Sequence, residues 1–146
     1  MHQYILPFHL QTGNPNIFSL RALLASTLTP SWGMYAGYEL YEHEKFKDGG
    51  EEYRDSEKYE IKIREFNRAG KEKTLAPFIS HLNKIRNENS ALHWLRNLEF
   101  HHTDSEAIIA YSKRYEDNLI LVVVNLDPDV AQETTVHWEY VALRNT

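Results

Sequence analysis

The chain has 146 residues, 42% hydrophobic and 25% charged, which is the composition of an ordinary globular protein. Its formal net charge of -5 provides no basic stripe to follow phosphates, so nucleic acid is excluded as an expected partner. No apolar run approaches the roughly 20 residues that a membrane-spanning helix needs, and the absence of cysteine excludes disulfides and favours a cytoplasmic protein.

The first clear element is a helix that begins at Pro15. Asn14 can cap its first turn, and proline suits the first helical position. Apolar residues then recur at helical spacing until Thr29. The pattern predicts a helix over 15–29 that is apolar over much of its surface, and other elements are therefore expected to cover it.

The segment 31–41 (SWGMYAGYELY) predicts a short buried strand broken by Gly33 and Gly37. The charge-rich stretch 42–73 follows and predicts a loop of about thirty residues, a length that is unusual in a compact domain and often functional. A second helix is predicted over 74–87, because its apolar residues fall on one face.

The last third of the chain changes to a strand pattern. Four strands are predicted, at 98–101, 107–112, 119–124 and 134–138. Turn residues separate them, as in Asp127-Pro128-Asp129. The sequence therefore predicts α/β structure over residues 1–95, followed by an all-β, antiparallel unit over residues 96–146.

Aromatic residues gather between the two predicted helices. They are Trp32, Tyr35, Tyr38, Tyr41, Phe46, Tyr53 and Tyr59. Such side chains combine an apolar ring with a polar edge, which suits stacking on sugar rings. The residues alone favour the simpler interpretation that tyrosine is common on half-buried strands.

Four strings carry a family resemblance. They are PSWGMYAGYELYEH (30–43), EEYRDSEKYEIK (51–62), NKIRNENSAL (83–92) and LILVVVNLDP (119–128). In this order they resemble the bacterial maltosyltransferases of glycoside hydrolase family 13, in the alpha-amylase superfamily. The resemblance covers nearly the whole chain, and DSEKYE at 55–60 is its most specific part.

The resemblance implies a (β/α)8 TIM barrel followed by a β-sandwich C-terminal domain. The helix 15–29 would then be the seventh barrel helix, 32–38 the eighth strand and 74–87 the eighth helix. A complete barrel needs about 250 residues, and a sandwich has about seven strands. We therefore expect a C-terminal fragment, made of the last βα repeat of a barrel and the start of an antiparallel β-sandwich.

The resemblance also implies a reaction. The complete enzyme would transfer maltosyl units from alpha-maltose 1-phosphate to the non-reducing end of alpha-1,4-glucans, with retention and without a cofactor. Retaining transfer needs two carboxyl groups about 5–5.5 Å apart, and the resemblance places both before Met1. By the same resemblance, a third, transition-state-stabilising carboxylate aligns with Tyr4, a neutral residue. Either the first four residues come from a shifted or substituted start, or this copy has lost the group. No catalytic residue is therefore assigned, and we expect this chain to be inactive alone.

The resemblance transfers two substrate-binding positions, onto Lys58 and Tyr59. An ammonium and a phenol can donate to sugar hydroxyls while the ring flanks the pyranose. The residues alone favour an exposed pair in a charged loop. The other acidic residues nearby match no catalytic role and are predicted to be solvated or ion-paired: Glu39, Glu42, Glu44, Glu51, Glu52, Asp55, Glu57 and Glu60. The eight histidines show no zinc spacing, so no metal is expected.

Three functions stay open at this stage. The first is a fragment of a maltosyltransferase of glycogen and alpha-glucan synthesis, a homodimer when complete. The alternative is a non-catalytic alpha-glucan-binding accessory module that uses the aromatic residues of 31–66. The third is a purely structural remnant. Because the apolar helix faces lack their neighbouring barrel strands, marginal stability or self-association is expected.

Overall fold

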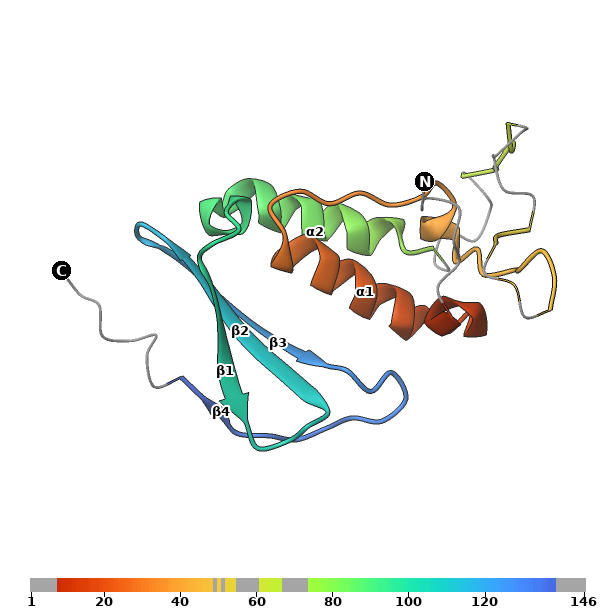
Figure 1. The fold of residues 1–146 in the computed structure, drawn as a ribbon. Coiled ribbons are helices and arrows are strands. Elements are labelled where there is room, and N and C mark those ends of the chain that lie inside the picture. The colour runs from red at the N-terminus through yellow and green to blue at the C-terminus, as the bar shows by residue number, and fades with distance from the viewer. Residues whose placement is uncertain (1–7, 49, 51, 55–60, 67–73, 139–146) are drawn as a thin grey trace. The chain divides into compact units, whose positions relative to one another are not determined.

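The computed structural model describes residues 8–48, 50, 52–54, 61–66 and 74–138. The elements in chain order are η1 (Phe8–Thr12), α1 (Pro15–Leu28), η2 (Tyr38–Leu40), α2 (Ala76–Glu88), η4 (Ser90–His93), β1 (Leu98–Thr103), β2 (Ile108–Tyr115), β3 (Asn118–Asn125) and β4 (Val136–His137) (Figure 1). The chain divides into two compact units, the first made of 1–19 with 33–81 and the second of 20–32 with 82–146.

Both predicted helices are confirmed. α1 begins at Pro15, and the side-chain oxygen of Asn14 accepts a hydrogen bond from the amide of Asn16 at 3.0 Å, which satisfies one of the orphan donors of the first turn. The preceding Gly13 has a φ of 71°, a conformation that glycine adopts without strain. α2 runs from Ala76 to Glu88, within two residues of its predicted start.

The predicted strand at 31–41 is wrong. The segment forms bends, a turn and then η2, with left-handed φ values of 101° at Gly37 and 58° at Tyr41. A parallel barrel strand would receive its ladder hydrogen bonds from the neighbouring strands. The described residues offer this segment no such neighbour, so local turn conformations prevail.

The first unit is organised around the ring of Phe18, which is completely buried. The Tyr38 hydroxyl donates to the Phe18 carbonyl at 2.6 Å, and the two rings lie 4.9 Å apart. The ring of Tyr41 meets the same phenylalanine edge-on at 5.3 Å. The amide of Leu75 donates to the carbonyl of Glu39 at 2.8 Å. These contacts fix the two ends of the charge-rich loop.

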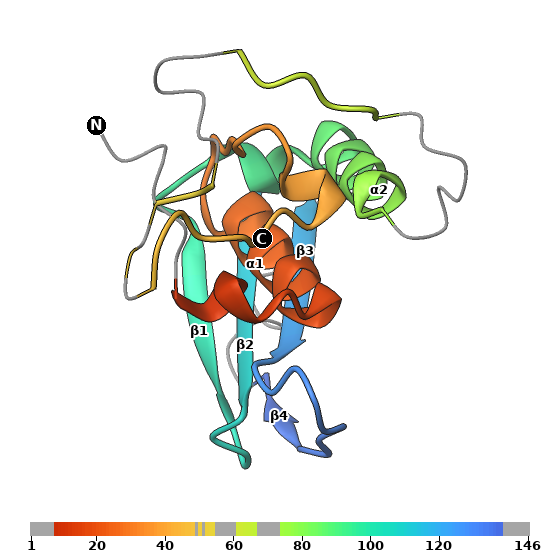
Figure 2. The same cartoon turned by 90° about the vertical axis from the view of Figure 1, so that its right-hand side faces the viewer.

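The second unit contains the predicted four-stranded antiparallel sheet, in the order β3-β2-β1-β4. Figure 2 shows β1, β2 and β3 side by side. The register pairs Tyr111 with Val122 and Ile109 with Val124, so these side chains share one face. The four predicted strands are therefore confirmed, although β4 has only two residues.

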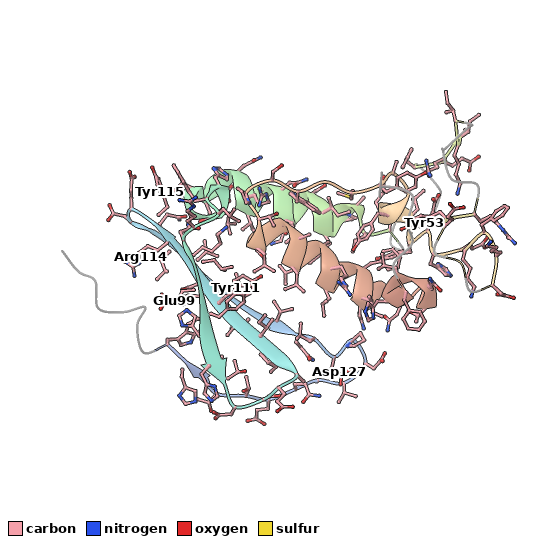
Figure 3. The ribbon with its side chains drawn as sticks, viewed as in Figure 1. Tyr53, Glu99, Tyr111, Arg114, Tyr115 and Asp127 are labelled. Atoms are coloured by element: carbon pink, nitrogen blue, oxygen red, sulfur yellow. The ribbon has the colours of Figure 1, made fainter. Side chains whose placement is uncertain are left out.

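The core of the second unit lies between this face and the last two turns of α1. Tyr111, Val122 and Val124 are buried there, and partly buried side chains of α1 pack against them: Leu20, Leu23, Leu24 and Leu28. Tyr111 points from β2 toward α1 (Figure 3). Its hydroxyl lies 2.6 Å from that of Thr27. The apolar stripe predicted for α1 thus finds its cover in the sheet.

Two cations are buried in the same unit. The Arg86 guanidinium donates to the carbonyls of Ser26, of Thr29 at 3.1 Å and of Pro30 at 2.8 Å, which satisfies carbonyls at and just beyond the end of α1. Lys113 on β2 is fully buried, and its ammonium has no hydrogen-bond partner among the described residues. Burial, and then the nearby Arg86, lower the pKa of Lys113.

Candidate functional site

A pocket of about 490 Å³ lies in the first unit, within the charge-rich loop that the sequence analysis placed near substrate. Its lining residues are Leu40, Tyr41, Glu42, His43, Glu44, Tyr53, Arg54, Lys62, Ile63, Arg64 and Glu65. The size falls in the usual range for small-molecule sites.

A short antiparallel contact brings the two sides of the loop together. Lys45 and Tyr53 form a β-bridge; the amide of Phe46 donates to Glu52, and that of Arg54 to Glu44, each at 2.8 Å. The bridge places Tyr53, which Figure 3 labels, in the lining of the pocket. Only 6% of this residue is exposed.

On the other side of the pocket, Glu42 forms ion pairs with both Lys62 and Arg64. These three residues are called the Glu42 centre. Arg64 donates through Nε to one carboxylate oxygen at 2.9 Å and through Nη2 to the other at 3.2 Å. Lys62 Nζ lies 3.2 Å from the second oxygen. The Arg64 side chain is only 3% exposed, so the two-point pairing compensates a nearly buried charge.

Two tyrosines form the aromatic wall of this centre. The rings of Tyr35 and Tyr53 lie 5.3 Å apart, and the guanidinium of Arg64 lies 5.5 Å above the ring of Tyr35. Burial, and then the charges of Glu42 and Tyr35, raise the pKa of Tyr53 to about 12. The Tyr53 hydroxyl therefore keeps its proton at neutral pH and can both donate and accept.

The charges of the pocket are balanced. Lys62 and Arg64 pair with Glu42, and Arg54 pairs with Glu44 at 2.9 Å. A phosphate would have to compete with these carboxylates for every lysine and arginine of the lining. A neutral, hydroxyl-rich ligand would not, because hydroxyls can both donate to carboxylates and accept from cations.

Some of the site residues predicted from the sequence lie within the described residues, and others lie outside them. Lys58 and Tyr59, predicted to bind substrate, and Tyr4, aligned with the third carboxylate, lie outside the described residues. The prediction that the loop carboxylates are solvated or ion-paired is confirmed for Glu42 and Glu44.

Sequence reasoning missed the two basic residues that complete the centre, Lys62 and Arg64. They alternate along the sequence, and both side chains reach the carboxylate of Glu42. That alternation was the available signal. Their partner Glu42 lies 22 residues before Arg64, a separation that no local pattern links.

Residues 100–145 match the family model described as GLGE, C-terminal. The chain is 54% identical over 133 residues to alpha-1,4-glucan:maltose-1-phosphate maltosyltransferase 2 of Streptomyces coelicolor, covering 90% of this chain and 20% of the relative. It is 50% identical over 142 residues to the maltosyltransferase of Corynebacterium glutamicum, covering 95% of this chain and 21% of that relative.

A relative from Rhodospirillum rubrum with the same name is 48% identical over 130 residues, which cover 88% of this chain and 18% of the relative. The chain thus spans about one fifth of the length of these relatives. Within the described ranges, no helix has the length and apolar character to cross a bilayer. The resemblance predicted from the four strings is confirmed: over about nine-tenths of its length, this chain is homologous to the C-terminal part of the alpha-1,4-glucan:maltose-1-phosphate maltosyltransferases.

Proposed function

We propose that this chain is the C-terminal part of an enzyme that transfers maltosyl units from alpha-maltose 1-phosphate to the non-reducing end of alpha-1,4-glucans. The enzyme would serve glycogen and alpha-glucan synthesis. The observation that carries the proposal is an identity of 45% to 55% with proteins of that name over about nine-tenths of the chain.

In this proposal residues 1–95 supply the last βα repeat of a TIM barrel of the alpha-amylase superfamily. Residues 96–146 begin a β-sandwich. The order of α1, a long charged loop and α2 supports the first assignment. The antiparallel sheet and the C-terminal family match support the second. The segment 32–38 would pair as the eighth strand only when the preceding barrel strands are present.

The pocket in the charged loop would face the sugar chain of the acceptor or donor. Loops that follow barrel strands build the active site in this architecture. The paired cations around Glu42 favour sugar hydroxyls over a phosphate, and the two tyrosines of the pocket lining, Tyr41 and Tyr53, could contact a sugar ring. Lys58 and Tyr59 would add direct sugar contacts.

The isolated chain would be inactive, because its two principal carboxylates would come from earlier barrel strands and Tyr4 stands at the third position. The complete enzyme would be a cytoplasmic homodimer. No step of the proposed reaction requires a cofactor, since phosphate is the leaving group.

A graft tests the proposal. The matching segment of the Streptomyces coelicolor maltosyltransferase 2 is replaced by this chain, once with Tyr4 and once with Tyr4→Asp. Phosphate release from alpha-maltose 1-phosphate is measured with a malto-oligosaccharide acceptor, after circular dichroism has shown that both chimeras fold. We expect transfer with Asp at position 4, a loss of at least a hundredfold with Tyr4, and none from the chain alone.

Each arm has its own contrary result. A folded Tyr4→Asp chimera without transfer would contradict the proposed function. Equal rates with Tyr4 and Asp would contradict the role given to position 4, and turnover by the chain alone would contradict its inactivity.

The alternative, an alpha-glucan-binding module without turnover, is favoured by the aromatic pocket wall. It predicts that the chain alone is retarded in an amylose-containing gel, and that combining Lys58→Ala with Tyr59→Ala abolishes the retardation. Lys84→Ala, on the exposed side of α2, is the control. Unchanged migration of the unmodified chain would exclude this function.

A further inference from the structure

Three side chains with metal-ligating atoms meet where β1 and β4 pair. His137 Nε2 lies 2.8 Å from Asp104 Oδ1, and His102 Nε2 lies 3.9 Å from the same oxygen. The three ligand atoms all lie within 4.8 Å of one another. Among the described residues this is the only such group of three, and it belongs entirely to the second unit.

The backbone holds these side chains in place. His102 and His137 are direct partners in the β1–β4 register, and their rings lie 5.2 Å apart. Asp104 follows two residues after His102, so both side chains leave the backbone on the same side. The amide of Asp104 donates to the carbonyl of Thr135 at 3.2 Å, which extends the pairing past the end of β1. All three ligands thus share one backbone scaffold.

The ligand set selects a class of ion. Two imidazoles and one carboxylate suit Zn²⁺ and the neighbouring late first-row ions better than Mg²⁺ or Ca²⁺, which prefer oxygen alone. Ligand atoms about 2.0–2.1 Å from a tetrahedral zinc lie about 3.3–3.4 Å from each other. The two measured separations, 2.8 Å and 3.9 Å, lie on either side of that value.

We propose that His102, Asp104 and His137 bind a divalent transition-metal ion of the zinc type, with water completing the coordination. The ion would take the place of the hydrogen bond between His137 Nε2 and Asp104, with the neutral His137 ring carrying its single proton on Nδ1 and any second proton released to solvent. His102 and Asp104 are exposed and His137 is half-buried, so the ligands can close around an ion without disturbing the core.

The bound ion would act as a clamp on the sheet. β4 contributes only two residues to its pairing with β1, against eight paired positions between β2 and β3. A strand held by so few hydrogen bonds gains most from an added cross-link. A metal ion at this site would therefore hold β4, which follows the long β3–β4 connection, against β1.

The proposal departs from the expectation that the chain holds no metal. That expectation rested on histidine spacing, and His102 and His137 lie 35 positions apart on strands that only the folded sheet brings together. The pairing of His137 with Asp104 also has a plain explanation as an ion pair, and the experiment must separate the two.

The test is a titration of the tag-free chain, labelled with ¹⁵N at histidine, with zinc chloride. We expect the imidazole resonances of His102 and His137 to shift together and saturate at one equivalent. His102→Gln and Asp104→Asn should each weaken binding at least tenfold, since even outer-shell changes cost that much. His81→Gln, on the exposed face of α2, is the matched control and should bind zinc unchanged.

A second readout reports the clamp. Hydrogen exchange of the Asp104 amide should slow on addition of zinc in the unmodified chain and in His81→Gln, but not in Asp104→Asn. Equal zinc affinity in all variants, or shifts confined to other histidines, would overturn the proposal and leave the His137–Asp104 contact as an ion pair only.

Discussion

The ammonium of Lys113 is buried inside the second unit, although lysine usually keeps its charge in water. A buried group without a partner pays its desolvation cost without recovering a hydrogen bond. The pKa of Lys113 is lowered, chiefly by burial and then by Arg86, which is the response expected of a charge in such a place.

Replacing Lys113 by Met should therefore stabilise the second unit, by about 1–3 kcal/mol at pH 7. All three tryptophans of the chain lie in this unit, at positions 32, 94 and 138, so urea unfolding followed by their fluorescence reports it selectively. Lys84→Met, an exposed lysine on α2, should change stability by less than about 0.5 kcal/mol. A destabilised Lys113→Met would mean that the ammonium has a partner in solution.

The same lysine gives a pH dependence. Its folded pKa is below the ordinary 10.5, so between these values the unfolded chain binds more protons and stability rises with pH. The stability of the second unit should therefore increase as the pH is raised from the lowered folded pKa of Lys113 toward 10.5, and Lys113→Met should lose that lysine's contribution to the increase. Unfolding at a series of pH values measures both; an equal rise in the variant would contradict the assignment.

Whereas removal of Lys113 should stabilise the protein, removal of the Glu42 charge should destabilise it, because Lys62 and Arg64 both pair with this carboxylate. Glu42→Gln would remove the charged group that the nearly buried Arg64 contacts through two nitrogens, and should destabilise the first unit by about 1–3 kcal/mol. The amides of Phe46 and Arg54 report this unit, and their hydrogen exchange should accelerate. Glu44→Gln removes an exposed pair and should cost less than about 1 kcal/mol. Equal exchange in the two variants would show that the Glu42 centre does not hold the loop.

The pKa of Tyr53 gives a second measurement on the Glu42→Gln variant. Its pKa of about 12 owes part of its rise to Glu42, so Glu42→Gln should move it toward 10.0. In the unmodified chain the folded state keeps this proton longer than the unfolded state does. The stability of the first unit should therefore fall as the pH rises from about 10 to about 12. Titration of ¹³C-labelled tyrosine checks both statements.

At the scale of elements, the end of α1 depends on one side chain. Arg86 reaches three carbonyls at or beyond the last turn, and its planar guanidinium can serve them together. Arg86→Met should cost about 2–4 kcal/mol in the tryptophan-monitored unfolding, because two or three carbonyls lose their donor at once. Arg86→Lys should recover less than half of this loss, since a single ammonium cannot match the fork. Full recovery by lysine would show that charge alone matters here.

The helices and the sheet could be predicted because their signals are local. Capping at Asn14, the apolar spacing along α1 and the turn residues between strands all act within a few positions. The segment 31–41 could not, because a strand needs a partner strand as well as a suitable sequence, and among the described residues this segment pairs with none. Gly37 and Tyr41 adopt left-handed φ values in turns instead.

In the candidate site, too, features set by local sequence could be predicted and contacts between distant residues could not. The charged loop itself could be located from composition, and the aromatic residues were recognised as a cluster. Which carboxylate pairs with which cation could not be predicted, because Glu42 and Arg64 meet only through the fold of the loop. The His102–His137 pair, likewise, depends on the register of β1 with β4.

At the scale of the whole molecule, β3 adds two exposed apolar side chains to the outer face of the sheet, which is polar on β1 and β2 at Glu99, Ser112 and Arg114. Leu121 and Val123 point away from the core made by Val122 and Val124, and each is about half exposed (49% and 48%). Exposed apolar neighbours at a strand edge favour self-association. Combining Leu121→Lys with Val123→Lys should shift sedimentation velocity profiles toward monomer, whereas Val130→Lys, beyond the strand, should not. A monomeric unmodified chain would contradict this expectation.

The sheet order has one more consequence. Among the described residues β3 is paired on one side only, by β2, and its segment 119–124 (LILVVV) has neither charge nor proline. The unpaired edge of β3 can pair with β3 of another copy of the chain and so start a growing β-aggregate. The rate at which soluble chain is lost would then be limited by nucleation of these aggregates. Loss of soluble protein should show a lag phase, and fibrils of a synthetic 118–125 peptide should act as seeds that shorten it. Any element that pairs with this edge of β3 or covers it would then protect the chain from association.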